Sequence, residues 1–143
     1  MTTTETAQAA AFVERFAAVW SAPTAAALAQ LGHPEVVLIQ PGMRTMRGRD
    51  EVLRGWTQLF RAMPDLRGEV HRWAPTEDGV LIELSLRAKV ARRPFEWWLV
   101  DRIVIEDGLV RERVTYQDPR PLALEALKAP RKWPAFVRLA AAR

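Results

Sequence analysis

Cysteine is absent from this chain of 143 residues, and histidine occurs only twice, as His33 and His71. The absence of cysteine excludes disulfides, thiolate zinc sites and cysteine nucleophiles. Two histidines, far apart in the sequence, are too few for a histidine-rich metal centre. We therefore expect neither a metal nor another cofactor, so that any chemistry must come from the chain's own side chains.

The sequence also lacks the common short motifs and long hydrophobic runs. It contains no glycine-rich dinucleotide or phosphate loop, and neither GxSxG nor HExxH is present. No stretch approaches the roughly 18 uncharged apolar residues that a membrane helix needs. The first ten residues, MTTTETAQAA, carry an acidic residue rather than a basic one, unlike a signal peptide. We therefore expect a cytoplasmic protein that does not bind a membrane.

Basic residues are in modest excess, with 21 Lys and Arg against 17 Asp and Glu and a formal net charge of +4. They are spread along the whole chain and balanced locally by acidic residues, whereas nucleic-acid binding needs a concentrated basic patch. We therefore expect no nucleic-acid partner. A chain of this length can bury a substantial core, and it shows no repeat or linker, so residues 1–143 are predicted to form a single domain.

The first half of the chain has helical periodicity. Residues 5–20 carry apolar side chains at helical spacing, and a second, shorter helix is predicted for 24–31, where a proline precedes it and a glycine follows. A third helix is predicted to open at Asp50 and to end before Pro64.

From residue 66 onward, apolar and polar residues alternate as is typical of β-strands. Because the helices come first and most strands afterwards, the order predicts an α+β fold in which helices cover one face of a curved antiparallel sheet. The predicted strands are 35–40, 67–73, 80–90, 95–105 and 109–118.

One face of the strand at 95–105 carries a carboxylate, Asp101, in an otherwise apolar row. A lone charge is unfavourable in such a place. If the hairpin loop is 106–108, Arg113 lies opposite Asp101 on the same face of the sheet. We therefore expect a direct pair between these two side chains.

The opposite face of the hairpin carries Trp98, Val104 and Tyr116 among charged residues. An apolar patch with a polar rim, on a sheet face that helices do not cover, is typical of a protein interface. Since identical subunits commonly meet through such a patch with two-fold symmetry, we expect a homodimer.

The order of three helices, an early strand and a long hairpin, together with the segment VDRIVIEDGLVRERVTYQD, resembles the nuclear transport factor 2-like superfamily. The resemblance is to its SnoaL-like polyketide cyclase and ketosteroid isomerase branch and covers about residues 8–120, with 121–143 as a helical tail. It implies a cone-shaped α+β barrel, in which three N-terminal helices pack on the concave face of a curved antiparallel sheet around a deep pocket. It implies no single activity, because the fold hosts many.

The resemblance also implies where to look for catalytic groups. Ketosteroid isomerases of this superfamily use a tyrosine on the first helix, an aspartate base at the end of the first strand and a protonated aspartate on the penultimate strand. Matching the elements in order places Phe16 and Gln40 at the first two positions, and only Asp101 matches. We therefore expect no steroid isomerisation by that mechanism.

Limonene epoxide hydrolases of the same superfamily use an arginine and an aspartate on a middle strand and a second aspartate on the last strand. Those positions correspond to Leu84, Leu86 and Thr115 in this chain. None of these side chains can activate water, so we expect no epoxide hydrolysis either.

Two functions remain open from the sequence. In the first, a small and largely apolar pocket binds a small hydrophobic molecule, such as a polyketide, terpenoid or steroid-like compound, and the domain is non-catalytic or of unknown activity. In the second, Asp101 and Arg113 serve a cofactor-free isomerase, cyclase or lyase, unless they form a purely structural ion pair. The residues predicted to line the pocket are Phe16, Trp20, Gln40, Trp56, Phe60, Trp97 and Thr115.

Overall fold

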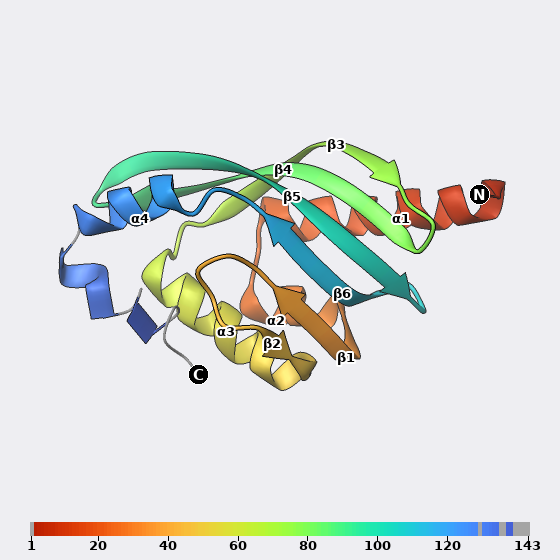
Figure 1. Ribbon diagram of the computed structural model, residues 1–143, viewed down its shortest axis with the longest axis horizontal. Helices are drawn as coiled ribbons and strands as arrows, with labels where there is room; N and C mark the ends of the chain where they lie inside the picture. The colour runs from red at the N-terminus through yellow and green to blue at the C-terminus, as the bar shows by residue number, and fades with distance from the viewer. Residues whose placement is uncertain (1, 129, 135–136, 139–143) are drawn as a thin grey trace.

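The computed structural model describes residues 2–128, 130–134 and 137–138, and Figure 1 shows their arrangement. Three helices precede most of the strands, as the sequence predicts, and a short helical segment follows the last strand. The elements are α1 (Thr3–Ser21), α2 (Ala25–Gln30), β1 (Gly32–Ile39), β2 (Met46–Arg47), α3 (Gly48–Ala62), β3 (Arg67–Pro75), β4 (Gly79–Val90), β5 (Arg93–Glu106), β6 (Leu109–Tyr116), α4 (Arg120–Leu127) and the 3-10 turn η1 (Pro130–Lys132).

The local sequence explains where the first helices begin. Thr2 and Glu5 form a capping box, in which each side chain accepts a hydrogen bond from the other residue's amide. The Thr24 hydroxyl accepts a hydrogen bond from a first-turn amide of α2. Helix α3 begins at Gly48 rather than at Asp50, which lies instead in the first turn, where the helix dipole favours a carboxylate.

The core lies between the helices and one face of the sheet. Helix α1 packs on β3 and β4, and α3 packs on β1, so that both cover the same side of the curved sheet (Figure 1). Full burial of one large apolar side chain stabilises a fold by about 1.5–3 kcal/mol. The helical contributions to the core are Ala9, Phe12, Val13, Phe16 and Trp20 from α1, and Val52, Trp56, Leu59 and Ala62 from α3.

The sheet has six strands in the order β2-β1-β6-β5-β4-β3. The α+β class and the curved sheet are confirmed, but the sheet is mixed rather than wholly antiparallel, because β1 runs parallel to β6. A long connection through α3 and four strands separates these two neighbours, and such a crossover permits a parallel pair. The sheet also stays open, with β2 and β3 at its edges, rather than closing into a barrel.

A β-bulge in β6 sets which side chains face the core. The turn consists of Asp107 and Gly108, both with positive φ, so Glu106 pairs with Leu109. The register then shifts by one at Arg111, because Ile105 pairs with Val110 but Val104 pairs with Glu112.

The bulge corrects the predicted hairpin register. Asp101 pairs with Thr115, and Arg113 pairs with Ile103, so the expectation that Asp101 lies directly opposite Arg113 is wrong. Arg113 is nevertheless on the same face, at the diagonal position. The loop is one residue shorter than predicted, which alone would turn Arg113 to the opposite face of the sheet. The extra residue of the bulge compensates, so Arg113 and Asp101 share a face as predicted.

The segment after β6 leads into the short helix α4. Asp118 accepts hydrogen bonds from the side chain and the amide of Arg120 at the start of α4, and the side-chain bonds are the main reason that the pKa of Asp118 falls to about 2.

The rest of the predicted helical tail includes Phe136 and Leu139, which lie outside the described residues. Within the described part of the chain, no helix is both long and apolar enough to cross a membrane.

Candidate functional site

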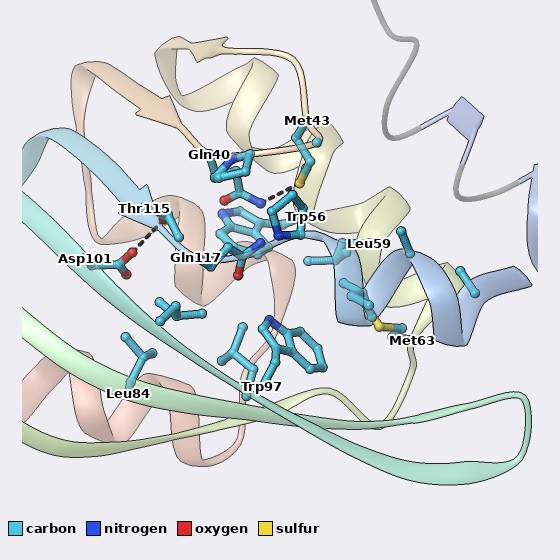
Figure 2. Close-up of a pocket in the computed structure, with 18 of the residues that line it drawn as sticks. Gln40, Met43, Trp56, Leu59, Met63, Leu84, Trp97, Asp101, Thr115 and Gln117 are labelled. Carbon is cyan, nitrogen blue, oxygen red and sulfur yellow. Dashed lines mark hydrogen bonds between the residues drawn. The ribbon is translucent and has the colours of Figure 1, made fainter.

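A cavity of about 520 Å³ lies between the inner face of the sheet, helix α3 and the C-terminal segment (Figure 2). Cavities that hold small organic ligands commonly measure roughly 300–1,000 Å³. The walls are mainly apolar, because they are formed by the core faces of β4, β5 and the helices. Its large apolar residues include Trp20, Met43, Trp56, Leu59, Met63, Leu84, Leu86, Trp97 and Leu99.

The polar side chains of the cavity are gathered at one end (Figure 2). Gln40 follows β1, Asp101 lies on β5, and Arg113, Thr115 and Gln117 lie on or just after β6. The parallel pairing of β1 with β6 explains this gathering, since it brings the carboxyl ends of both strands to one place. Among the described residues that line the cavity, Asp101 and Arg113 are the ionisable ones.

Asp101 is buried at this polar end, with 1% of its surface exposed. The Thr115 hydroxyl donates a 2.6 Å hydrogen bond to Asp101 Oδ1, and Arg113 Nε lies 3.9 Å from the same oxygen. The second distance is too long for a hydrogen bond. Burial raises the pKa of Asp101 above its usual range, and the Arg113 charge and the Thr115 hydrogen bond lower it only in part. Burial therefore favours the neutral acid.

Arg113 is held mainly by contacts other than Asp101. Its Nη2 donates a short hydrogen bond to Gln40 Oε1, and its Cζ lies 5.2 Å from the centroid of the Trp56 ring, a cation-π contact. Arg113 is 5% exposed, and its Nε–H has no hydrogen-bond partner within the described residues. A guanidinium with an unused donor beside an apolar cavity can bind a ligand oxygen.

The structure places five of the seven predicted lining residues in the cavity wall: Trp20, Gln40, Trp56, Trp97 and Thr115. The other two lie outside that wall. Phe16 is a core residue whose ring packs between those of Phe12 and Trp20, and Phe60 packs against Trp56 with ring centroids 6.4 Å apart.

The C-terminal segment contributes to the cavity in a way that sequence reasoning missed. Leu122, Ala123, Ala126 and Leu127 of α4 line it, together with Trp133 and Val137. Their spacing along α4 is helical, and this was the available signal. No residue of α4 is fully buried, so the helix covers the cavity without joining the core.

His33, Glu106 and Asp107 are the one group of described residues arranged as metal ligands. The site does not suit a cation, because His33 Nδ1 accepts a hydrogen bond from the Glu35 amide, and Glu106 already lies 3.4 Å from the Arg111 guanidinium. Both acidic side chains are also exposed. We assign no metal role to this cluster.

The chemistry available in the cavity is hydrogen-bond donation and positive charge. Asp101 is the only described lining group that can act as a proton donor or acceptor, since no histidine, lysine, tyrosine or second carboxylate lines the cavity within the described residues. A reaction that needs both an acid and a base would therefore have to use Asp101 together with a group of the ligand itself.

Comparisons with known proteins agree with this fold. The sequence profile of the SnoaL-like domain matches residues 13–113, whereas no curated protein matches the chain. A provisionally assigned SnoaL-like polyketide cyclase from Jannaschia sp. CCS1 is 20% identical, with a TM-score of 0.73 over 91% of this chain and 97% of that chain. TerC, co-crystallised with polyporic acid, is 12% identical, with a TM-score of 0.74 over 84% of this chain and 98% of that chain.

A third solved structure is a protein with a ketosteroid isomerase-like fold from Catenulispora acidiphila DSM 44928, in complex with trimethylamine. It is 18% identical, with a TM-score of 0.68 over 75% of this chain and 85% of that chain. Sequence identities this low show only that these proteins share a fold with this chain. The profile match covers most of the chain and includes both Asp101 and Arg113. The chain therefore belongs to the SnoaL-like domain family and has the fold of the nuclear transport factor 2-like superfamily.

Proposed function

We propose that the cavity binds a small, largely apolar molecule that carries a carbonyl, hydroxyl or similar oxygen group. The proposal rests on one observation: the cavity has apolar walls and a single polar end, where Asp101 lies beside Arg113 and Thr115. The apolar walls would supply affinity through burial of the ligand's hydrocarbon surface. The polar end would orient its oxygen.

The proposed ligand class is polyketide-like, terpenoid or steroid-like. Terpenoid and steroid-like compounds have hydrocarbon frames with few oxygen atoms, and this distribution matches a cavity that is polar only at one end. One structural relative, provisionally assigned as a polyketide cyclase, supports the polyketide member of this class. Another, TerC, was crystallised with polyporic acid, a small organic molecule that carries oxygen groups.

A cofactor-independent isomerase, cyclase or lyase is the second candidate function. It is favoured by the buried Asp101, whose raised pKa allows it to act as an acid or to hydrogen-bond an oxygen that gains negative charge. Arg113 would support the same oxygen. The lack of a separate base among the described lining residues favours binding over this alternative.

We further propose that the protein is a homodimer through the outer face of the sheet. Trp98 and Tyr116 are 51% and 57% exposed there, and the ring of His71 stacks on Trp98 at 4.1 Å. Exposed aromatic side chains on an uncovered sheet face favour association with a second copy.

Calorimetric titration with 2-naphthalenemethanol, a neutral aromatic alcohol, tests the binding function. The wild type should bind it, and Ala126→Trp should weaken binding at least about tenfold, or 1.4 kcal/mol, because Ala126 lines the cavity on the half-buried side of α4. Leu124→Trp is the matched control, since Leu124 lies on the same helix, is 61% exposed and is not among the lining residues. Absence of binding by the wild type would contradict the proposal.

A further inference from the structure

Two residues of the cavity wall carry donors that lack acceptors. Arg113 Nε–H and Trp20 Nε1–H are both buried, and neither has a hydrogen-bond partner within the described residues. Both side chains line the cavity, and they are only 5% and 2% exposed. Unpaired buried donors are uncommon and unfavourable, so a ligand acceptor that reaches the guanidinium of Arg113 would be stabilised.

The charges at the polar end of the cavity do not balance when Asp101 is neutral. Arg113 then remains as a positive charge beside apolar walls, held by the neutral amide of Gln40 and the ring of Trp56. Its Nε is 3.9 Å from Asp101 Oδ1, so the structure shows no hydrogen bond between the two side chains. A buried cation without a close anion favours a ligand that brings one.

We propose that the ligand of this cavity is an apolar monoanion, with a delocalised oxyanion such as a carboxylate, enolate or phenolate, which binds to the guanidinium of Arg113 at the polar end. The inference rests on the proposed function and specifies the charge of its ligand. The Thr115 hydroxyl donates its hydrogen bond to Oδ1 of Asp101. The described residues make no hydrogen bond to Oδ2, which can therefore carry the proton and donate it to the same anion.

Binding of the anion is then coupled to the protonation of Asp101. The groups that face Asp101 are Thr115 and Arg113 of β6 and the apolar Ile82 of β4, its cross-strand neighbour. Arg113 is the one charged group among the described residues that shifts the pKa of Asp101. The negative charge of a bound anion would offset the positive charge of Arg113, which lowers the pKa of Asp101 in the free protein. The pKa of Asp101 would therefore rise further when the anion binds. Affinity for the anion should fall as pH rises through the titration of Asp101 in the free protein.

The test is a calorimetric comparison of 2-naphthoate with 2-naphthalenemethanol, which have the same ring system and differ in charge. The wild type should bind the naphthoate at least about tenfold more tightly at pH 6, where it is ionised, and this preference should shrink toward pH 9. Arg113→Met should abolish or reverse the preference. If that variant does not fold, Asp101→Asn gives the second measurement: it keeps a side-chain oxygen for Thr115, and its naphthoate affinity should no longer depend on pH.

The outcomes separate this inference from the function on which it rests. Equal or weaker binding of the naphthoate, with the alcohol bound, would overturn the anion assignment and leave the proposed function standing. A naphthoate preference that is retained in folded Arg113→Met would also overturn it. A failure of the wild type to bind either probe would overturn both proposals.

Discussion

Thr115 lies directly opposite Asp101 across the β5–β6 ladder, and its hydroxyl donates a 2.6 Å hydrogen bond to the Asp101 carboxylate. The bond lies within the cavity wall, where both residues are less than a tenth exposed. It holds one carboxylate oxygen in place and leaves the other to the cavity. Thr115 therefore positions the acid, while Arg113 supplies charge from the diagonal position.

Thr115→Val tests this positioning role, because valine keeps the shape and removes the hydroxyl. The hydrogen bond lowers the pKa of Asp101, so its loss should raise that pKa further. The free energy of unfolding should fall by about 1 kcal/mol. The carboxyl carbon of Asp101, followed by NMR during a pH titration, gives the shift. Thr57→Val is the control, since Thr57 is half-buried on α3 and its hydroxyl donates a hydrogen bond only to the Leu53 carbonyl of its own helix.

Asp101→Asn should change how stability depends on pH. The pKa of Asp101 is raised in the folded state, so the folded protein holds this proton more tightly than the unfolded chain does. Its contribution to stability is complete below the unfolded value of about 3.9 and is lost as pH rises through the folded value. The wild type should therefore lose stability relative to Asp101→Asn with rising pH, by at most about 1.4 kcal/mol per pH unit. Urea unfolding at several pH values measures the difference, and a constant difference would argue against a raised pKa.

Helix α4 should affect ligand binding more than stability. Leu127 lines the cavity yet is 61% exposed, so Leu127→Ser removes ligand contact at little cost to the fold. The affinity for 2-naphthalenemethanol should fall about three- to tenfold, because the ligand no longer buries apolar surface against the leucine side chain. Leu124→Ser is matched in residue type, helix and exposure but does not belong to the described lining. Equal effects of the two variants would contradict a role for α4 in the cavity.

Trp98→Glu should convert a dimer into a monomer, as measured by sedimentation. The substitution places a charge at the centre of the proposed interface, where it would be desolvated on association. Leu53→Glu, at a position 40% exposed on α3, changes charge equally on another face and should leave the assembly unchanged. A monomeric wild type would contradict the proposed dimer.

Neither a Δ5-ketosteroid nor limonene epoxide should be turned over above the background rate. The residues at the isomerase base position and at the two aspartate positions of the hydrolase are Gln40, Leu86 and Thr115, and none of them can accept a proton from substrate or water. The cavity contains Asp101 as its one described carboxylate. Product formation by pure protein, followed by chromatography, would refute the position matching.

The helices and most strands could be predicted because their signals are local. Apolar spacing and caps define α1 and α2, and alternation defines β4 and β5. The parallel pairing of β1 with β6 could not be predicted in the same way, since it joins segments about 75 residues apart through tertiary packing alone.

The site was predicted in part for the same reason. Alternation places Asp101 and Arg113 on one face, and the structure brings them within 3.9 Å. Their register depends on the bulge at Arg111, and the polar run of Arg111, Glu112 and Arg113 has no apolar pattern to reveal it. Contacts such as Arg113 with Gln40 and Trp56 depend on tertiary packing, which the local sequence does not specify.

The bulge makes β6 one residue longer than its partner strand requires, and this affects how the chain must be aligned with others. A relative with a regular strand needs a one-residue gap at Arg111; without it, Glu112 and Val114 would be equated with residues that face the relative's cavity. Deletion of Arg111 would leave Arg113 and Thr115 beside Asp101, whereas deletion of Val114 would turn the residues beyond it to the other face. Insertions and deletions in this strand can thus exchange the polar groups of the cavity without any substitution.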